Sequence, residues 1–181
     1  MKNNVIKSLL LQAIIFTVLF STMFYLTVPG HNYNFWFNDN ELQVVLFYCS
    51  PILIFVYYMF GIFVLKKQKT LIKNFVSVFP VTLIGLILWA ISFLTTDFSG
   101  ITCPDCQYPR YGIFKLIYDS YTLPFKLISS FLTNVFLEVI INSDISGKEY
   151  HMGLNILELI ESVIPSFIFL TGIYVKGMKI P

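Results

Sequence analysis

Charged residues are scarce in this chain of 181 residues: only 12% are Asp, Glu, Lys or Arg, whereas 56% are hydrophobic. An average soluble domain carries roughly a quarter of its residues as charges. So few charges cannot cover the surface of a soluble globule, and they exclude a disordered chain and a nucleic-acid-binding domain. The composition predicts an integral membrane protein of the all-α class, with a single membrane domain over residues 1–181.

Catalytic motifs and a cysteine framework are also missing. The sequence contains no G-x-x-x-x-G-K, no G-x-S-x-G and no H-E-x-x-H, so ATP hydrolysis, serine hydrolysis and zinc proteolysis have no support. Its three cysteines are too few for a framework of disulfides. We therefore lean against an enzyme, and no cofactor is expected from these patterns.

Four long hydrophobic runs predict membrane-spanning helices at residues 8–28, 42–65, 75–95 and 156–175. The first three have at least 21 residues each without an internal charge. At about 1.5 Å per residue, such a helix crosses a hydrocarbon core roughly 30 Å thick. Residues 29–41 and 96–155 are then expected to form two outer loops, in which Tyr118 and Tyr121 belong to an interfacial belt of aromatic residues.

Residues 123–141 form the ambiguous segment, because polar residues recur there every three or four positions and give an amphipathic pattern. If this segment lies on or dips into the outer leaflet, the chain has four spans; if it crosses, there are five. Cytoplasmic loops collect Lys and Arg. We favour four spans, with the segment as an extracytoplasmic amphipathic helix, because both termini are then cytoplasmic together with eight of the twelve basic residues, namely Lys2, Lys7, Lys66, Lys67, Lys69, Lys73, Lys176 and Lys179.

The sharpest local signal is the sequence Cys103-Pro104-Asp105-Cys106 in the second outer loop. Two thiols at this spacing close and reopen a small disulfide, so Cys103 and Cys106 are redox candidates. The tetrapeptide and the four-helix architecture resemble the quinone-linked disulfide-forming oxidoreductases of membranes, which implies thiol oxidation with quinone as cofactor. Those proteins typically relay electrons through a second cysteine pair, whereas this chain has only Cys49 besides, in the second span, where we expect apolar packing. A disulfide that simply holds the loop is the alternative.

A metal site is not expected. Cys103, Cys106, His31 and His151 all fall on the outer side and together supply the four ligand atoms that zinc takes. The two histidines, however, stand far apart in the sequence without a ligand spacing of their own.

Glu158 and Glu161 form the second chemical lead, because they lie three residues apart and share one face at the start of the fourth span. An acid within the membrane is costly and usually faces protein or water. We interpret them first as interfacial acids whose side chains reach outward to the polar layer; the alternatives are that they pair with Lys115 or Lys126, bind a cation or carry a proton.

Three functional hypotheses follow. The first is an accessory, interaction or immunity-type protein whose partners are the lipid bilayer and another membrane protein or a second copy, without nucleic acid. The alternatives are a thiol-disulfide oxidoreductase using Cys103 and Cys106, and an oligomeric permease for ions or small solutes using Glu158 and Glu161. Richness in Asn, Lys, Ile and Phe is typical of an AT-rich bacterial genome, so we expect a multi-pass protein of a bacterial plasma membrane.

Overall fold

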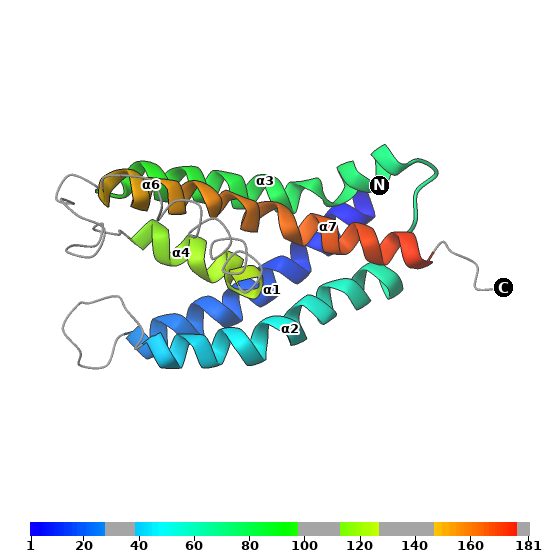
Figure 1. Cartoon of the computed structure of the whole chain (residues 1–181). Coiled ribbons are helices and arrows are strands. Elements are labelled where there is room, and N and C mark those ends of the chain that lie inside the picture. The colour runs from blue at the N-terminus through cyan, green and yellow to red at the C-terminus, as the bar shows by residue number, and fades with distance from the viewer. Residues whose placement is uncertain (28–38, 98–112, 127–146, 177–181) are drawn as a thin grey trace.

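Four long helices dominate the computed structural model, which describes residues 1–27, 39–97, 113–126 and 147–176. The described ranges are all-helical, which confirms the predicted class. The long helices run back and forth along one direction (Figure 1) and comprise α1 (Lys2–Thr27), α2 (Asp39–Phe63), α3 (Leu71–Thr95) and α7 (Leu159–Lys176). A shorter helix, α6 (Gly147–Leu157), leads into α7.

The helices coincide with the four predicted runs, although their ends differ by a few residues. Helix α3 starts four residues earlier than expected, because the Thr70 side chain caps it by accepting the Lys73 N–H at 3.3 Å. Within the described residues, three helical stretches are long and apolar enough to cross a membrane: Lys2–Thr22, Leu71–Thr95 and His151–Lys176. The apolar stretch Tyr48–Phe63 in α2 is shorter.

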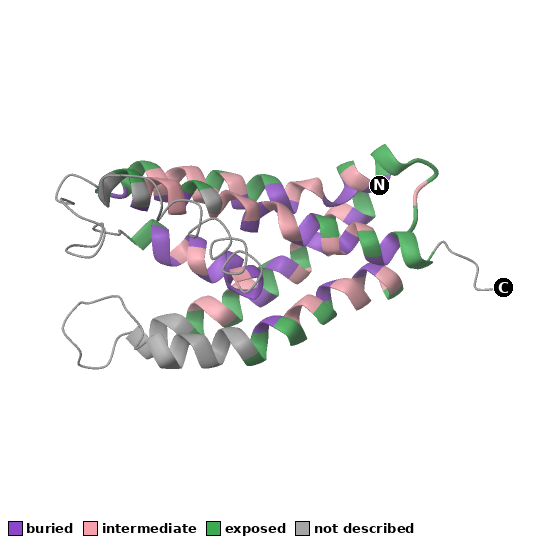
Figure 2. Ribbon diagram, in the orientation of Figure 1, coloured by how far each residue is buried: buried purple, intermediate pink, exposed green. Residues whose placement is uncertain are grey.

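The distribution of polarity is the reverse of that in a soluble protein. Large apolar side chains point outward, for example Leu94 at 81% exposure and Phe63 at 70%, whereas Ser162 and Ser166 are fully buried. Figure 2 shows the exposed residues along the outer sides of the helices and the buried ones where helices meet. This pattern suits helices that contact lipid on one side and bond to one another through small polar residues on the other.

A short helix, α4 (Ile113–Thr122), and the 3-10 turn η1 (Leu123–Phe125) lie inside the bundle, and we call residues 113–126 the re-entrant segment. We expected these residues in an outer loop and, from residue 123, in an amphipathic helix that lies on or dips into the outer leaflet. A position on the surface is wrong for the described part, since Leu123, Pro124 and Phe125 are all buried. Residues 127–141 lie outside the described residues.

The re-entrant segment completes the packing of the long helices. Helix α1 packs on α3, α3 on α7, and α7 on α2, while α4 contacts α1 and α3 and η1 contacts α2 and α7. The Phe125 ring is the main anchor, because its centroid lies 5.1 Å from that of Tyr57, which in turn lies 5.1 Å from that of Phe169. The segment therefore joins the α1 side of the bundle to the α2 side.

Helices α2 and α7 cross at two glycines. A Cβ atom added at Gly172 would lie 2.5 Å from the Tyr58 carbonyl oxygen and 2.9 Å from the Gly61 Cα. A Cβ atom added at Gly61 would lie 2.7 Å from the Phe169 carbonyl oxygen. Only glycine allows the two backbones to approach this closely, as is common where membrane helices pack.

Candidate functional site

The re-entrant segment ends near the middle of the bundle. The Tyr121 carbonyl accepts a hydrogen bond from Gln12 Nε2 at 3.2 Å, and the Tyr121 hydroxyl donates to the Val81 carbonyl at 2.6 Å. Gln12 and Val81 each lie about halfway along helices of 26 and 25 residues. Ten residues of α4 span about 15 Å, roughly half of a hydrocarbon core. Irregular backbone at this depth is tolerated only where protein or water surrounds it.

Five charged side chains gather around this segment, and we call Lys115, Asp119, Lys126, Glu158 and Glu161 the charge cluster. Lys115 Nζ lies 3.0 Å from Asp119 Oδ1 and also forms an ion pair with Glu158, although its side chain is only 8% exposed. Lys126 Nζ lies 2.8 Å from the same Asp119 oxygen. Asp119 therefore bridges two lysines, and the Lys115–Glu158 pair ties α4 to the start of α7.

Ion pairs shift the pKa values of two residues of the re-entrant segment, Lys115 and Asp119. Burial by itself would raise the pKa of Asp119, but Lys115 and Lys126 outweigh burial and hold this pKa below its ordinary value. Burial would likewise lower the pKa of Lys115, but Asp119 and Glu158 outweigh it and raise this pKa above its ordinary value. The two lysines thus favour the charged form of Asp119, and the carboxylates favour the charged form of Lys115.

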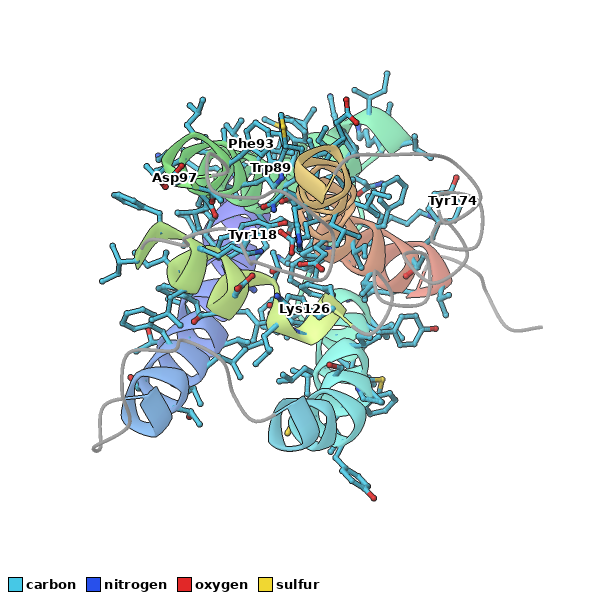
Figure 3. The ribbon with its side chains drawn as sticks, turned by 60° about the vertical axis from the view of Figure 1, so that its left-hand side comes forward. Trp89, Phe93, Asp97, Tyr118, Lys126 and Tyr174 are labelled. Atoms are coloured by element: carbon cyan, nitrogen blue, oxygen red, sulfur yellow. The ribbon has the colours of Figure 1, made fainter. Side chains whose placement is uncertain are left out.

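Helix α6 passes into α7 through a tightened turn at Glu158. The Glu158 carbonyl accepts the Glu161 N–H at 2.9 Å, a spacing of three residues instead of four. It also accepts the Tyr118 hydroxyl, which comes from α4. Figure 3 shows Tyr118 and Lys126 between the long helices, whereas Trp89, Phe93 and Asp97 follow one another along α3. The turn between α6 and α7 is thus hydrogen-bonded to a residue of α4.

Glu161 is the most deeply buried acid of the cluster, with 2% exposure. Deeper along the same side of α7, the Ser166 hydroxyl donates to the Val78 carbonyl at 3.0 Å and accepts from the Thr82 hydroxyl at 2.7 Å. These polar contacts join α7 to α3 below the cluster.

The structure places the candidate residues from the sequence in different environments. Of the alternatives for the two glutamates, pairing with a lysine is found for Glu158, which forms an ion pair with Lys115. The expected outward position is wrong for Glu161, which is 2% exposed. The predicted interfacial position of Tyr118 and Tyr121 is wrong, because their exposures are 0% and 4%. Cys49 is an exposed free thiol on α2 and not part of the packed interior.

The other candidates remain predictions. Cys103, Cys106 and His31 lie outside the described residues. His151 is buried in α6, where its carbonyl accepts from the Asn155 side chain at 3.2 Å. Within residues 1–27, 39–97, 113–126 and 147–176, no group of three or more His, Cys, Asp or Glu is arranged to hold a metal ion.

Asp119 and the roles of Lys115 and Lys126 in docking a re-entrant segment were missed at the sequence level. One usable signal existed, because Lys115 and Asp119 are four residues apart and form a helical ion pair. Leu116 and Ser120, at the same spacing, are both buried although one is apolar and the other polar, so polarity along this helix does not separate exposed residues from buried ones.

Comparisons with protein-family models, curated proteins and solved structures find no match for this chain.

Proposed function

We propose that this chain is a small multi-pass protein of the bacterial plasma membrane that acts by interaction with another membrane protein, as an accessory or immunity-type factor. The proposed topology has four spans and cytoplasmic termini. It is supported by four long helices of alternating direction and by lysines gathered at the end where α1 begins and α7 ends. In this topology the re-entrant segment enters from the outer side.

The proposal rests on one observation: the polar groups between the helices bond to one another and to the backbone. Lys115, Asp119 and Glu158 are matched to one another across α4 and the start of α7, and Gln12 bonds to the backbone of α4. Removing one member of such a buried pair typically costs about 3–5 kcal/mol. These groups thus hold the re-entrant segment in place, while apolar faces remain on the outside for lipid or a partner helix.

In-membrane photocrosslinking tests the proposal. A photoreactive amino acid is placed singly at exposed apolar positions of each long helix, such as Ile14, Ile52, Ile87 and Phe167, with the buried Val78 as the control position. We expect one discrete protein adduct from a contiguous set of exposed positions and none from Val78. Lipid adducts alone from every exposed position would contradict an interaction role.

An ion or proton permease is the second candidate, and one observation favours it. The charge cluster lies where α4 meets the turn between α6 and α7, and ion sites of many transporters likewise lie at breaks in helices. Proton and cation flux into liposomes should then fall in Glu161→Gln, whereas Glu149→Gln, at an exposed position of α6, serves as the matched control. Flux that equals that of protein-free liposomes, or that is unchanged in Glu161→Gln, removes this candidate.

A further inference from the structure

Three segments of the chain converge at the end of the bundle opposite the charge cluster. The Asn4 side chain bonds to the Lys66 backbone twice, donating to the carbonyl at 2.7 Å and accepting from the N–H at 3.0 Å. Lys176, at the end of α7, donates to the Leu65 carbonyl at 3.2 Å. The start of α1, the α2–α3 link and the end of α7 therefore form one surface, visible on the right in Figure 1.

This surface carries charge of one sign only. Residues 1–8, 62–75 and 172–176 contain no Asp or Glu. The same residues contain seven lysines and the chain's amino terminus, and we call this set the lysine end: Met1, Lys2, Lys7, Lys66, Lys67, Lys69, Lys73 and Lys176.

Two of these lysines also stabilise the fold. Lys7 and Lys176 donate to the Val64 and Leu65 carbonyls just after α2, where a cation complements the helix dipole. Lys66, Lys69 and Lys73 are exposed. Lys66 is held in place through its backbone, so these contacts do not use its ammonium group.

The lysine end borders the apolar belt of the helices. Leu71, Ile72 and Phe63 are strongly exposed beside the lysines, and Lys67 Nζ lies 5.7 Å from the centroid of the Tyr174 ring. Lysine stems follow apolar surface while the ammonium groups reach outward to the polar layer. Ammonium groups and exposed apolar side chains thus lie next to one another at this end of the bundle.

We propose that the lysine end binds the phosphate headgroups of anionic phospholipids. The charge complementarity is complete, since cations from three segments face the headgroup layer without a carboxylate among them. A lipid fits better than a free phosphate because its acyl chains cover the exposed Leu71 and Ile72 while its phosphate meets the neighbouring lysines.

The test measures the dissociation constant of phosphatidylglycerol added to the full chain in neutral micelles, with phosphatidylcholine as the uncharged comparison. The triple variant K66Q/K69Q/K73Q removes three exposed charges, and K66R/K69R/K73R is the matched control that keeps them. Each lysine near a membrane surface contributes a factor of about five to binding. We expect wild type and the arginine variant to prefer phosphatidylglycerol by about tenfold or more, and the glutamine variant to lose most of this preference.

Several results would overturn the proposal. They are equal affinity of the wild type for both lipids, an unchanged preference in the glutamine variant, and displacement of phosphatidylglycerol by an equal concentration of inorganic phosphate. Because the Lys66 contacts to Asn4 use backbone atoms, the glutamine variant should keep its helical circular dichroism spectrum. If that spectrum is lost, the single variants K69Q and K73Q are measured instead, and each should weaken phosphatidylglycerol binding alone.

Discussion

Two Gly→Ala substitutions, one at the crossing of α2 and α7 and one away from it, are expected to change the free energy of unfolding in opposite directions. In Gly172→Ala the new methyl group would lie 2.5 Å from the Tyr58 carbonyl oxygen and 3.0 Å from the Ile62 nitrogen. Both are backbone atoms, so the helices must separate. Overpacking of this kind costs about 1–3 kcal/mol.

Part of that cost is offset within α7 itself. Alanine is favoured over glycine inside a helix by about 1 kcal/mol. We therefore expect Gly172→Ala to lower the free energy of unfolding by up to about 2 kcal/mol. Gly153→Ala is the control, because a Cβ atom there meets nothing within 4 Å and only the helix propensity changes, so this variant should be equally stable or up to about 1 kcal/mol more stable.

The measurement is reversible unfolding in mixed micelles with increasing denaturing detergent, followed by circular dichroism. The two alanine variants should differ by about 2 kcal/mol in free energy of unfolding, close to a 30-fold difference in the equilibrium constant. The double variant with Gly61→Ala should cost less than the sum of the single ones, because helices that have already separated accommodate the second methyl group. Equal stability of Gly172→Ala and Gly153→Ala would refute the close crossing.

Three further predictions concern the re-entrant segment. Phe125→Ala removes the ring that packs on Tyr57, so the free energy of unfolding should fall by about 3–5 kcal/mol; a fall below about 1 kcal/mol would mean that η1 is not docked there. In a double-mutant cycle, Lys115→Gln and Glu158→Gln should each destabilise strongly, and the double variant by about 0.5–3 kcal/mol less than their sum; additive effects would argue against the ion pair. Asp119 has a lowered pKa in the folded protein, so its stabilising contribution is complete above its unfolded pKa of about 4 and is lost as the pH falls through the folded value. The free energy of unfolding of Asp119→Asn should therefore fall less on acidification than that of the wild type. An identical fall would assign the pH dependence to other groups.

The long helices could be predicted from the sequence because a hydrophobic run of about 20 residues has few other stable forms. The three runs without internal charge became α1, α2 and α3, and the run from residue 156 became most of α7. The start of α3 was missed because Thr70 caps a turn that contains Lys73, which hydropathy alone places in the loop.

The re-entrant segment could not be predicted for a physical reason. Its residues are buried on nearly all sides, so polar residues such as Ser120 and Thr122 are found inside together with Leu116. This helix is amphipathic, but Lys115 and Ser120 are buried whereas Ile113 and Phe114 are exposed, so interpreting the periodicity as a boundary between water and an apolar core selects the wrong face. The second partner of Lys115, Glu158, lies 43 residues further along the sequence in the turn between α6 and α7, so only the pairing of Lys115 and Lys126 with Asp119 was visible locally.

The central claim is that residues 113–126 enter the bundle from the outer side and stop at its middle. In a background with serine at all three native cysteines, single cysteines at the exposed Ile113 and the buried Leu123 are exposed to a membrane-impermeant maleimide in intact cells. We predict that the Ile113 position is labelled from outside and that the Leu123 position is labelled only after denaturation. Labelling at position 123 from the cytoplasmic side would establish a fifth span, and labelling from outside as fast as at position 113 would establish a surface helix; either result contradicts the account.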